Sequence, residues 1–433
     1  MMNYSWLTLS SARTQLAARL ADPNMVKWTS AELTFWITDA LRQWNALTST
    51  WKTEYTFNPT TNWNALGALA NSPRLRTVTD TQVYTLMQYA LTEPPTGGTW
   101  TGTSQFSIAD LSGALQRRRD EIIQVANCNQ AIINPASTPN VRRGALPDTT
   151  IEPQRVRFLP TDSAHFPPVT LSRSDQVAEE FFEPDFPNET PAMPQEWMVA
   201  SEPPLAFNVD VAPSVAGKYE VVALQSGVPF TPPAANLLGI PDDFAWLARY
   251  GALADLLGRE SDATDLPRAQ WCQKRYMDGL KLIASAPWIF LASVNGVPVD
   301  VSSMTQQDCF WPEWDSDPNF WPTLVTAGMD FFWVPTTPAG NSIGMTVIGN
   351  APCPILDADF IQVSRSVWDA VLSMAQFLCA FKMGGAEFSS AMGLEKIFIQ
   401  AAEQEGQRLS KLGIFSDVLN TRSTSEIRQQ ERW

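Results

Sequence analysis

The only histidine, His165, is the first residue to consider for acid–base chemistry, because imidazole titrates near neutral pH and binds metals. It lies in the proline-rich segment Ala164–Pro168. One histidine excludes histidine-based catalytic triads and metal sites built from several histidines, so we interpret His165 as a surface or turn residue. The motifs G-x-x-x-x-G-K-[ST] and G-x-G-x-x-G after a strand are absent. The pattern G-x-S-x-G occurs at Gly340–Gly344, but it leads into a predicted strand and not from a strand into a helix, as a nucleophile elbow requires. The sequence therefore predicts no catalytic residues and no cofactor.

Three carboxylates alternate in the segment Glu313–Asp317, at Glu313, Asp315 and Asp317. On an extended backbone they lie on one side, which suits a hard cation such as calcium. The segment lacks the turn glycine and the distant glutamate of a helix-loop-helix calcium site. We therefore interpret it as a solvated acidic loop and predict no metal.

The five cysteines contain no C-x-x-C pair and are an odd number, which argues against a zinc site and against a disulfide framework. We expect them to be buried free thiols in a reducing cytosol. They are Cys128, Cys272, Cys309, Cys353 and Cys379.

Four tryptophans are close together in a loop-rich part of the chain: Trp311, Trp314, Trp321 and Trp333. Indole rings serve as core residues, as anchors of subunit interfaces or as stacking platforms for sugar rings, and all three roles remain open here. We assign Trp311, Trp314 and Trp321 as candidate partner-binding residues.

The chain is strongly acidic, with 30 Lys and Arg against 45 Asp and Glu and a formal net charge of -15. A protein that grips nucleic acid must present cations that displace counterions, so we expect DNA to be repelled. The basic clusters are Arg117–Arg119 and Arg142–Arg143. Three consecutive helical residues point in different directions, so we expect the first cluster to form a solvated face or salt bridges between subunits. Brief contact with phosphates is the alternative.

Two helices are predicted over residues 9–50. We expect Ser10 or Ser11 to cap the first, and a capping box of Thr29 and Glu32 to start the second. The apolar positions of the second helix follow one helical face, at Leu33, Trp36, Ile37, Ala40, Leu41, Trp44 and Leu47. A strand is predicted at Lys52–Phe57, and two further helices start at residues 79 and 107.

Short alternating runs bounded by proline and glycine predict strands between residues 130 and 235. These strands are Arg155–Leu159, Glu196–Ala200, Leu205–Val211 and Lys218–Leu224. A helical hairpin follows, opened by Ile240–Pro241, with Asp265 as the cap of its second helix.

The last third of the chain is predicted to repeat this arrangement. Its strands are Asp330–Val334 and Ile343–Ile348. Asp243–Phe244 and Asp359–Phe360 are each interpreted as the start of a helix. We therefore predict an α+β fold in which helical hairpins lie beside small antiparallel sheets, and in which Leu205–Ile283 superposes on Asp330–Phe398.

Three stretches carry a resemblance to a known family. They are the opening block Leu9–Leu47 with its Val26-Lys-Trp-Thr, the strand pair within Glu196–Val221, and the run Ile240–Tyr276 that begins Ile-Pro-Asp-Asp-Phe. In this order they resemble the head-to-tail adaptor proteins, also called head-completion or neck proteins, of tailed bacteriophages. The resemblance implies a non-enzymatic virion protein that forms a dodecameric ring beneath the portal. This chain is longer than the small adaptors, and the repeated part after about residue 320 departs from their pattern.

The C-terminal segment Thr421–Trp433 is polar and has no apolar stripe to bury, so we expect it to be disordered alone. It ends on Trp433 and carries Arg422, Arg428 and Arg432. We predict that these four residues order on a partner, with the portal preferred.

We predict four regions: helical residues 1–130, a strand-pair and hairpin module at 131–290, a similar module at 291–420, and a docking tail at 421–433. The expected partners are other copies of the chain, the portal, a tail or nozzle protein, and genomic DNA that passes without specific binding. Neither a signal peptide nor a membrane span is predicted, so we expect assembly in the host cytoplasm and a final place in the virion neck. The alternatives are another tail or baseplate component and a glycan-binding virion protein.

Overall fold

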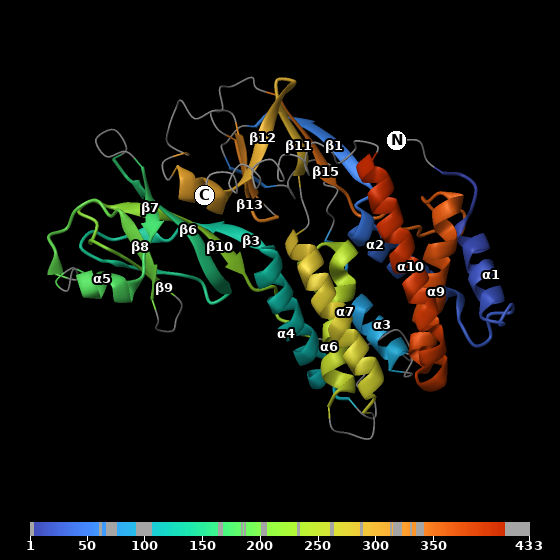
Figure 1. Ribbon diagram of the computed structural model, residues 1–433. Coiled ribbons are helices and arrows are strands. Elements are labelled where there is room, and N and C mark those ends of the chain that lie inside the picture. Colours follow the sequence, from blue (N-terminus) through green and yellow to red (C-terminus); the bar gives the residue numbers. More distant parts are fainter. Residues whose placement is uncertain are drawn as a thin grey trace, which may run out of the picture.

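The protein is seen in a computed structural model that combines a large helical bundle with two β-sheets (Figure 1). The structure describes residues 4–59, 63–65, 76–91, 106–162, 168–182, 185, 188–200, 206–231, 234–259, 264–285, 289–311, 314, 323–329, 331–334 and 342–411.

All helices except α5 and α8 gather at one end of the molecule, and the sheets, with α5 and α8 beside them, extend away from this bundle (Figure 1). The helices are α1 (Leu9–Arg19), α2 (Ser30–Thr48), α3 (Asp80–Ala90), α4 (Ile108–Ala126), α5 (Gln176–Phe182), α6 (Ala245–Leu257), α7 (Leu266–Ser285), α8 (Met304–Phe310), α9 (Arg365–Met383) and α10 (Gly385–Lys411), with a 3-10 turn at Asp242–Phe244.

The N-termini of the first two helices agree only partly with the predictions. The cap of α1 is Thr8, whose side chain accepts from the backbone of Ser11, so the prediction of Ser10 or Ser11 as the cap was wrong. Thr29 caps α2 as predicted, accepting from the amide of Glu32. The Glu32 carboxylate does not complete a capping box, because it accepts from Lys382 at 2.8 Å and from the indole of Trp36 at 3.4 Å.

The first sheet, here sheet A, has the strand order β1-β15-β11-β12-β13-β14-β2. Its strands are β1 (Lys52–Phe57), β2 (Trp63–Ala65), β11 (Ile289–Val294), β12 (Val297–Ser303), β13 (Thr323–Ala327), β14 (Phe331–Trp333) and β15 (Ile343–Ile348). Only β12 and β13 pair in parallel; the other neighbours are antiparallel.

The second sheet, here sheet B, has the strand order β3-β10-β6-β7-β8-β9-β5, with β4 paired to β10. Its strands are β3 (Gln130–Ile133), β4 (Ala136–Ser137), β5 (Arg143–Ala145), β6 (Thr150–Pro160), β7 (Val169–Arg173), β8 (Glu196–Val199), β9 (Ala206–Val209) and β10 (Gly217–Gln225). The parallel pair here is β7 with β8.

One hydrophobic core joins helices from the beginning, middle and end of the chain. Trp44 of α2 packs edge-on against Phe398 of α10, and Trp271 of α7 lies 5.1 Å from Phe377 of α9 between ring centroids. Each sheet has a smaller core of its own. The bundle is therefore assembled by contacts between residues hundreds of positions apart.

The predicted α+β fold is confirmed, and so is the hairpin of α6 and α7, in which Asp265 accepts from the amide of Arg268. Two details were wrong. The predicted strand pairs are not neighbours, since three strands separate β9 from β10 and β14 from β15. Asp359–Phe360 lies before α9 in an extended stretch that bridges to Thr8, so it does not start a helix. Superposition of the two segments stays a prediction.

Candidate functional site

Trp314 is a buried contact between the two sheets, not an exposed anchor. Its side chain is 0% exposed and meets Trp333 edge-on at 4.7 Å between ring centroids. The indole N–H donates to Asp308 at 2.7 Å, and the guanidinium of Arg155 from sheet B lies 4.6 Å from the ring. The prediction that Trp314 binds another protein is therefore corrected, because its partners belong to the same chain.

Trp311 remains available to a partner. It is 51% exposed at the end of α8, and its neighbour Phe310 is 69% exposed. Trp321 lies outside the described residues, and so do Arg422, Arg428, Arg432 and Trp433. Trp314 and Trp333 face inward, so they do not form an exposed aromatic surface with Trp311.

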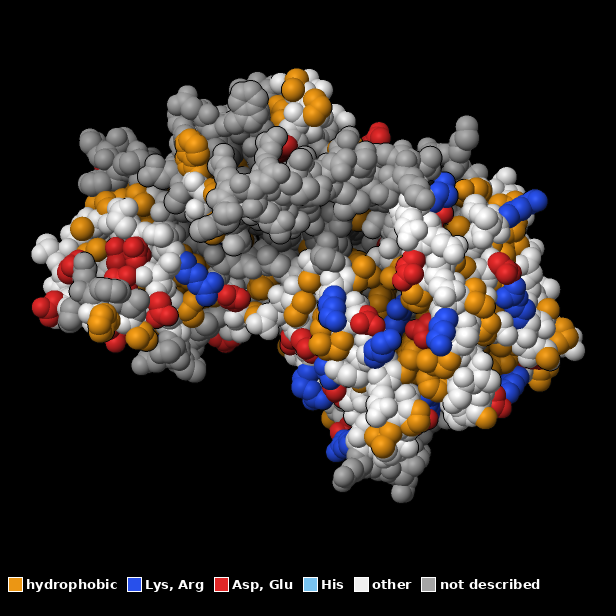
Figure 2. Space-filling model, in the orientation of Figure 1, with side chains coloured by type: hydrophobic (Ala, Val, Ile, Leu, Met, Phe, Trp, Pro, Cys, Tyr) orange, Lys and Arg blue, Asp and Glu red, His pale blue; other side chains and the backbone are white. Residues whose placement is uncertain are grey.

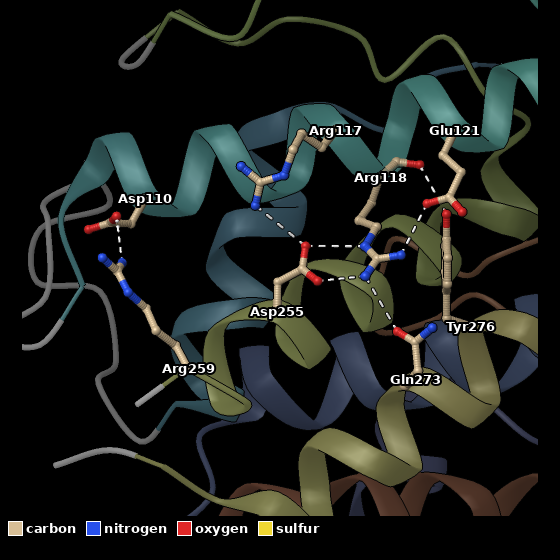
Figure 3. Close-up of polar contacts among 8 residues, drawn as sticks. All are labelled: Asp110, Arg117, Arg118, Glu121, Asp255, Arg259, Gln273 and Tyr276. Atoms are coloured by element: carbon tan, nitrogen blue, oxygen red, sulfur yellow. Dashed lines mark hydrogen bonds and ion pairs between the residues drawn. The ribbon is translucent and has the colours of Figure 1, made fainter. Parts of the chain in front are cut away.

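The basic cluster Arg117–Arg119 divides into three environments, as expected for successive residues of one helix. Arg118 is the centre of the network in Figure 3, where its guanidinium donates to both carboxylate oxygens of Asp255, at 3.1 and 2.5 Å. It also reaches Glu121 at 3.0 Å. The hydrogen bond to Asp255 raises the pKa of Arg118, so this arginine is committed to holding α4 against α6.

Arg119 is fully buried, although it carries a charge. It donates to the carbonyls of Val228 at 2.7 Å and Gly227 at 3.1 Å, and its guanidinium lies 4.2 Å from the ring centroid of Phe230. Desolvation lowers the pKa of Arg119. This residue anchors the loop after β10 to α4.

Arg117 and Arg259 are the exposed cations of this region, with side chains 69% and 60% accessible. Arg117 lies 3.5 Å from Asp255, and Arg259 donates to Asp110 at 2.8 Å (Figure 3). They border a cleft of about 320 Å³ between α4 and α6. Exposed ion pairs such as these contribute little to stability.

A buried polar cluster joins α2 to α6 and α7. Asp39 accepts from Arg249 at 2.8 Å and from Gln43 at 2.7 Å. Gln43 in turn accepts from Arg275 at 3.0 Å and lies 3.2 Å from the hydroxyl of Tyr250. Burial of charges costs least when they are paired and hydrogen-bonded. Asp39 and Arg249 meet that condition, whereas Nη1 of Arg249 and Nε of Arg275 are buried without a hydrogen-bond partner.

A second part of the cluster surrounds Asp243 at the start of α6. Its carboxylate accepts from the Asn45 side chain at 2.6 Å and from the Ala351 amide at 3.1 Å. Desolvation raises the pKa of Asp243 to about 7, against these hydrogen bonds and the nearby charge of Arg42. The adjacent Asp242 accepts from Thr77 and the amide of Val78.

A cavity of about 640 Å³ lies next to these groups, between α2, α3 and α6. Its walls include Asp39, Arg42, Trp246, Arg249 and Cys353. On its walls Asp39 and Arg249 are paired with each other, and the charge of Arg42 lies near Asp39, Asp242 and Asp243.

This polar cluster was not predicted from the sequence, although the spacing of two of its residues indicated it. Asp39 and Gln43 are four residues apart, next to the apolar stripe of α2. That spacing places them on one side of the helix. The whole helix is buried nearly all round, so the polar side is internal as well.

His165, Glu313, Asp315 and Asp317 lie outside the described residues. Within the described part of the chain, no group of His, Cys, Asp and Glu is placed to hold a metal ion. None of the described helices combines the length and apolar composition needed to cross a membrane. All five cysteines are free, and Cys309 is the exposed one.

No protein-family model matches the chain, and no curated protein matches it.

Proposed function

We propose that the chain is a structural protein of a tailed-phage particle, an adaptor that forms a ring between the portal and the tail and surrounds the DNA exit channel. The proposal is supported by the elements in which the resembling stretches lie. The opening block lies in α1 and α2, the middle stretch in β8, β9 and β10, and the last in α6 and α7. The order of helix pair, strands and helical hairpin follows the resemblance. The strand pair that the resemblance implies is not formed by neighbours, because β6, β7 and β8 separate β9 from β10.

The interface of α6 with its neighbours is the observation that carries the proposal. Helix α6 is buried along nearly its whole length, and the ion pairs Asp39–Arg249 and Arg118–Asp255 hold it against α2 and α4. A ring subunit under mechanical load needs such a rigid bundle. The Ile240–Tyr276 stretch therefore serves as a rigid support for the surfaces around it.

The charge of the chain fits a channel through which DNA slides. The net charge of -15 is repeated in every subunit of a ring. On the face seen in Figure 2, Lys and Arg side chains are interspersed with Asp and Glu over the helices and do not form one basic stripe. Like charge on the channel wall keeps a polyanion from binding tightly.

The decisive experiment is electron microscopy of the purified chain alone and mixed with the portal protein of the same phage. We expect rings, or caps of one defined stoichiometry on the portal. Particles that leave the portal bare and contain the chain elsewhere in the tail would replace this proposal with the alternative of a tail or baseplate component.

A glycan-binding role rests only on exposed aromatic residues such as Trp311 and Phe310. Titration with host polysaccharide, followed by tryptophan fluorescence, separates this role from the adaptor role. Because Trp314 and Trp333 are buried, we expect no saturable change. A saturable change that disappears in Trp311→Ala would favour the glycan-binding alternative.

A further inference from the structure

The two sheets have the same strand order when their strands are counted along the chain. Leaving out the short β4, each sheet has seven strands, and each has the order first, seventh, third, fourth, fifth, sixth, second. In both, the fourth and fifth strands are the parallel pair, and a seven-residue helix connects them, α5 in sheet B and α8 in sheet A. Two helices precede the first strand and two follow the seventh.

The elements of sheet B lie between two strands of sheet A in the sequence. The inner set, α3 to α7 with sheet B, is complete between β2 and β11. The outer set consists of α1, α2 and sheet A with α8, α9 and α10. One arrangement is thus nested inside the other, which separates the second and third strands of sheet A by more than two hundred positions.

Matching backbone details accompany this correspondence. α1 and α3 are both 11 residues long and are capped by Thr8 and Thr79. Each cap residue also forms an isolated antiparallel bridge to the segment that precedes the last helical pair of its set, Thr8 to Phe360 and Thr79 to Leu237. In both sets, the start of the first helix is therefore bridged to the segment before the last two helices.

The sheets also share an irregularity. The register of β15 against β11 shifts after Thr346, and the register of β10 against β6 shifts after Val222. β-bulges are retained within families because they re-aim a strand. Thr346 and Val222 therefore mark equivalent positions in the two sheets.

The outer set uses its connecting helix to contact the inner sheet. Met304 of α8 and the nearby Trp314 share a buried cluster with Val222, and Arg155, opposite Val222 in β6, is 4% exposed and lies 3.5 Å from Asp308 of α8. The face of β3, β10 and β6 that carries Val222 is covered in this way.

The equivalent face of the outer sheet is open. Thr346 is opposite Leu291 in β11 and Glu54 in β1. Leu291 is 54% exposed, although it occupies the position that Arg155 has in the covered sheet. Glu54 is exposed as well.

The equivalent helix of the inner set is open too. Val177 and Phe181 of α5 are 73% and 78% exposed. They are four residues apart and so lie on one side of the helix. Figure 2 shows hydrophobic side chains among acidic ones in the region of α5, which Figure 1 places at the end of sheet B away from the helices. Within one chain, a connecting helix packs on a sheet face once, as α8 on the β3–β10–β6 face. The corresponding surfaces of the second contact, α5 and the β1–β15–β11 face, are both exposed.

We propose that these two halves meet between chains: α5 of one copy packs on the β1–β15–β11 face of a second copy, as α8 packs on the β3–β10–β6 face within one copy. The occupant of both surfaces is the same chain. Because the two surfaces differ, the contact is head-to-tail and generates a ring where the rotation closes.

The test uses one variant for each half, Phe181→Asp on α5 and Leu291→Asp on β11, with Val26→Asp as a control for an exposed apolar residue away from both surfaces. Val26 is 83% exposed in the connection between α1 and α2. We expect the mass in solution, measured by light scattering, to fall to that of one chain in either variant and to stay unchanged in the control. A mixture of the two variants should give a dimer and nothing larger, because each retains the half that the other lacks.

A second readout reports the contact directly. Phe181→Cys and Leu291→Cys in one chain, in a Cys309→Ser background, should give disulfide-linked oligomers under oxidation, whereas either cysteine alone should not. A wild-type chain that stays monomeric, variants that assemble normally, or mixed variants that stay monomeric would each overturn the inference.

The inference rests on the self-association contained in the proposed function, and the two can fail separately. Rings that cap the portal but ignore both substitutions would retain the adaptor proposal and reject these surfaces. Assembly that depends on both surfaces, together with no binding to the portal, would retain the surfaces and reject the adaptor proposal.

Discussion

The guanidinium of Arg249 lies 2.8 Å from the carboxylate of Asp39, and the two side chains are only 2% and 7% exposed. Asp39 belongs to α2 and Arg249 to α6, so the pair crosses from the outer to the inner set of elements. Breaking a buried pair on one side leaves an uncompensated charge in the core. The pair is therefore a test of how strongly the two sets depend on each other.

We predict that Asp39→Leu lowers the free energy of unfolding by about 3–5 kcal/mol. The double variant Asp39→Leu/Arg249→Leu should lose less than the single one, because no buried charge remains. Denaturant titration measures both. As a control, Asp369→Leu removes the partner of Arg19 in a pair whose carboxylate is 78% exposed, and this should cost no more than about 1 kcal/mol. Equal losses for Asp39→Leu and Asp369→Leu would contradict the prediction.

The pH dependence of stability should reveal Asp243. Its pKa in the folded protein is about 7, above the ordinary value of 3.8 for an unfolded chain, because burial penalises the carboxylate. The folded state therefore binds the proton more tightly. The stabilisation from Asp243 is complete below the unfolded pKa and is lost as pH rises through about 7. Its size is about 1.4 kcal/mol per unit of pKa shift.

Asp243→Asn keeps the shape of the protonated side chain and removes the titration. Between about pH 5 and about pH 9, the free energy of unfolding of the wild type should fall relative to that of the variant. Parallel pH profiles for the two proteins would show that Asp243 does not titrate in this range.

Trp314 should contribute far more to stability than its neighbour Trp311. Trp314→Ala removes a fully buried ring and the hydrogen bond to Asp308, so the free energy of unfolding should fall by about 3–5 kcal/mol. Trp311→Ala truncates a side chain that is 51% exposed and should change it by no more than about 0.5 kcal/mol. Denaturant titration with near-ultraviolet circular dichroism follows both. Similar losses would mean that Trp314 does not join the sheets.

Much of the local structure was predictable from the sequence, because local signals determine it. The apolar stripe of α2, the cap at Thr29 and the second helix of the hairpin after Asp265 all depend on residues a few positions apart. The prediction of the N-cap of α1 was wrong for a local reason. Thr8, Ser10 and Ser11 are all favourable N-cap residues, and the sequence pattern does not show which of them caps the helix.

The pairing of the strands was not predictable in the same way. Tyr55 of β1 pairs with Met345 of β15, and no short-range pattern reports a partner so distant in sequence. The inner set of elements lies between β1 and β15 in the sequence. The prediction of two consecutive similar segments therefore did not include the nesting of one set inside the other. The inward position of Trp314 has the same origin, because Arg155 and Val222 of sheet B help to bury it together with Trp333 of sheet A.

The C-terminal residues should act in binding and not in folding. Truncation after Asn420 removes Arg422, Arg428, Arg432 and Trp433, the residues that we predict to bind the portal. We expect an unchanged melting temperature and loss of binding to the portal, measured by co-sedimentation. Trp433→Ala should weaken binding on its own if the indole is the anchor. Unchanged binding by the truncated chain would refute this role.

Gly279 of α7 marks the closest approach of the hairpin helices. A Cβ atom at this position would lie 2.0 Å from Cδ2 of Leu247 and 2.7 Å from Cη2 of Trp246, both on α6. Gly279→Ala should therefore force α6 and α7 apart and lower the free energy of unfolding by about 1–3 kcal/mol, although alanine favours the helix.

Gly393 of α10 is the matched control, since a Cβ atom there meets nothing within 4 Å. Gly393→Ala should raise the free energy of unfolding by about 0.5–1 kcal/mol, because the only effect left is the lower conformational entropy of the unfolded chain. Denaturant titration of both variants separates packing from helix propensity. If Gly279→Ala were as stabilising as Gly393→Ala, the two helices would not touch through this glycine, and the rigid hairpin would need another basis.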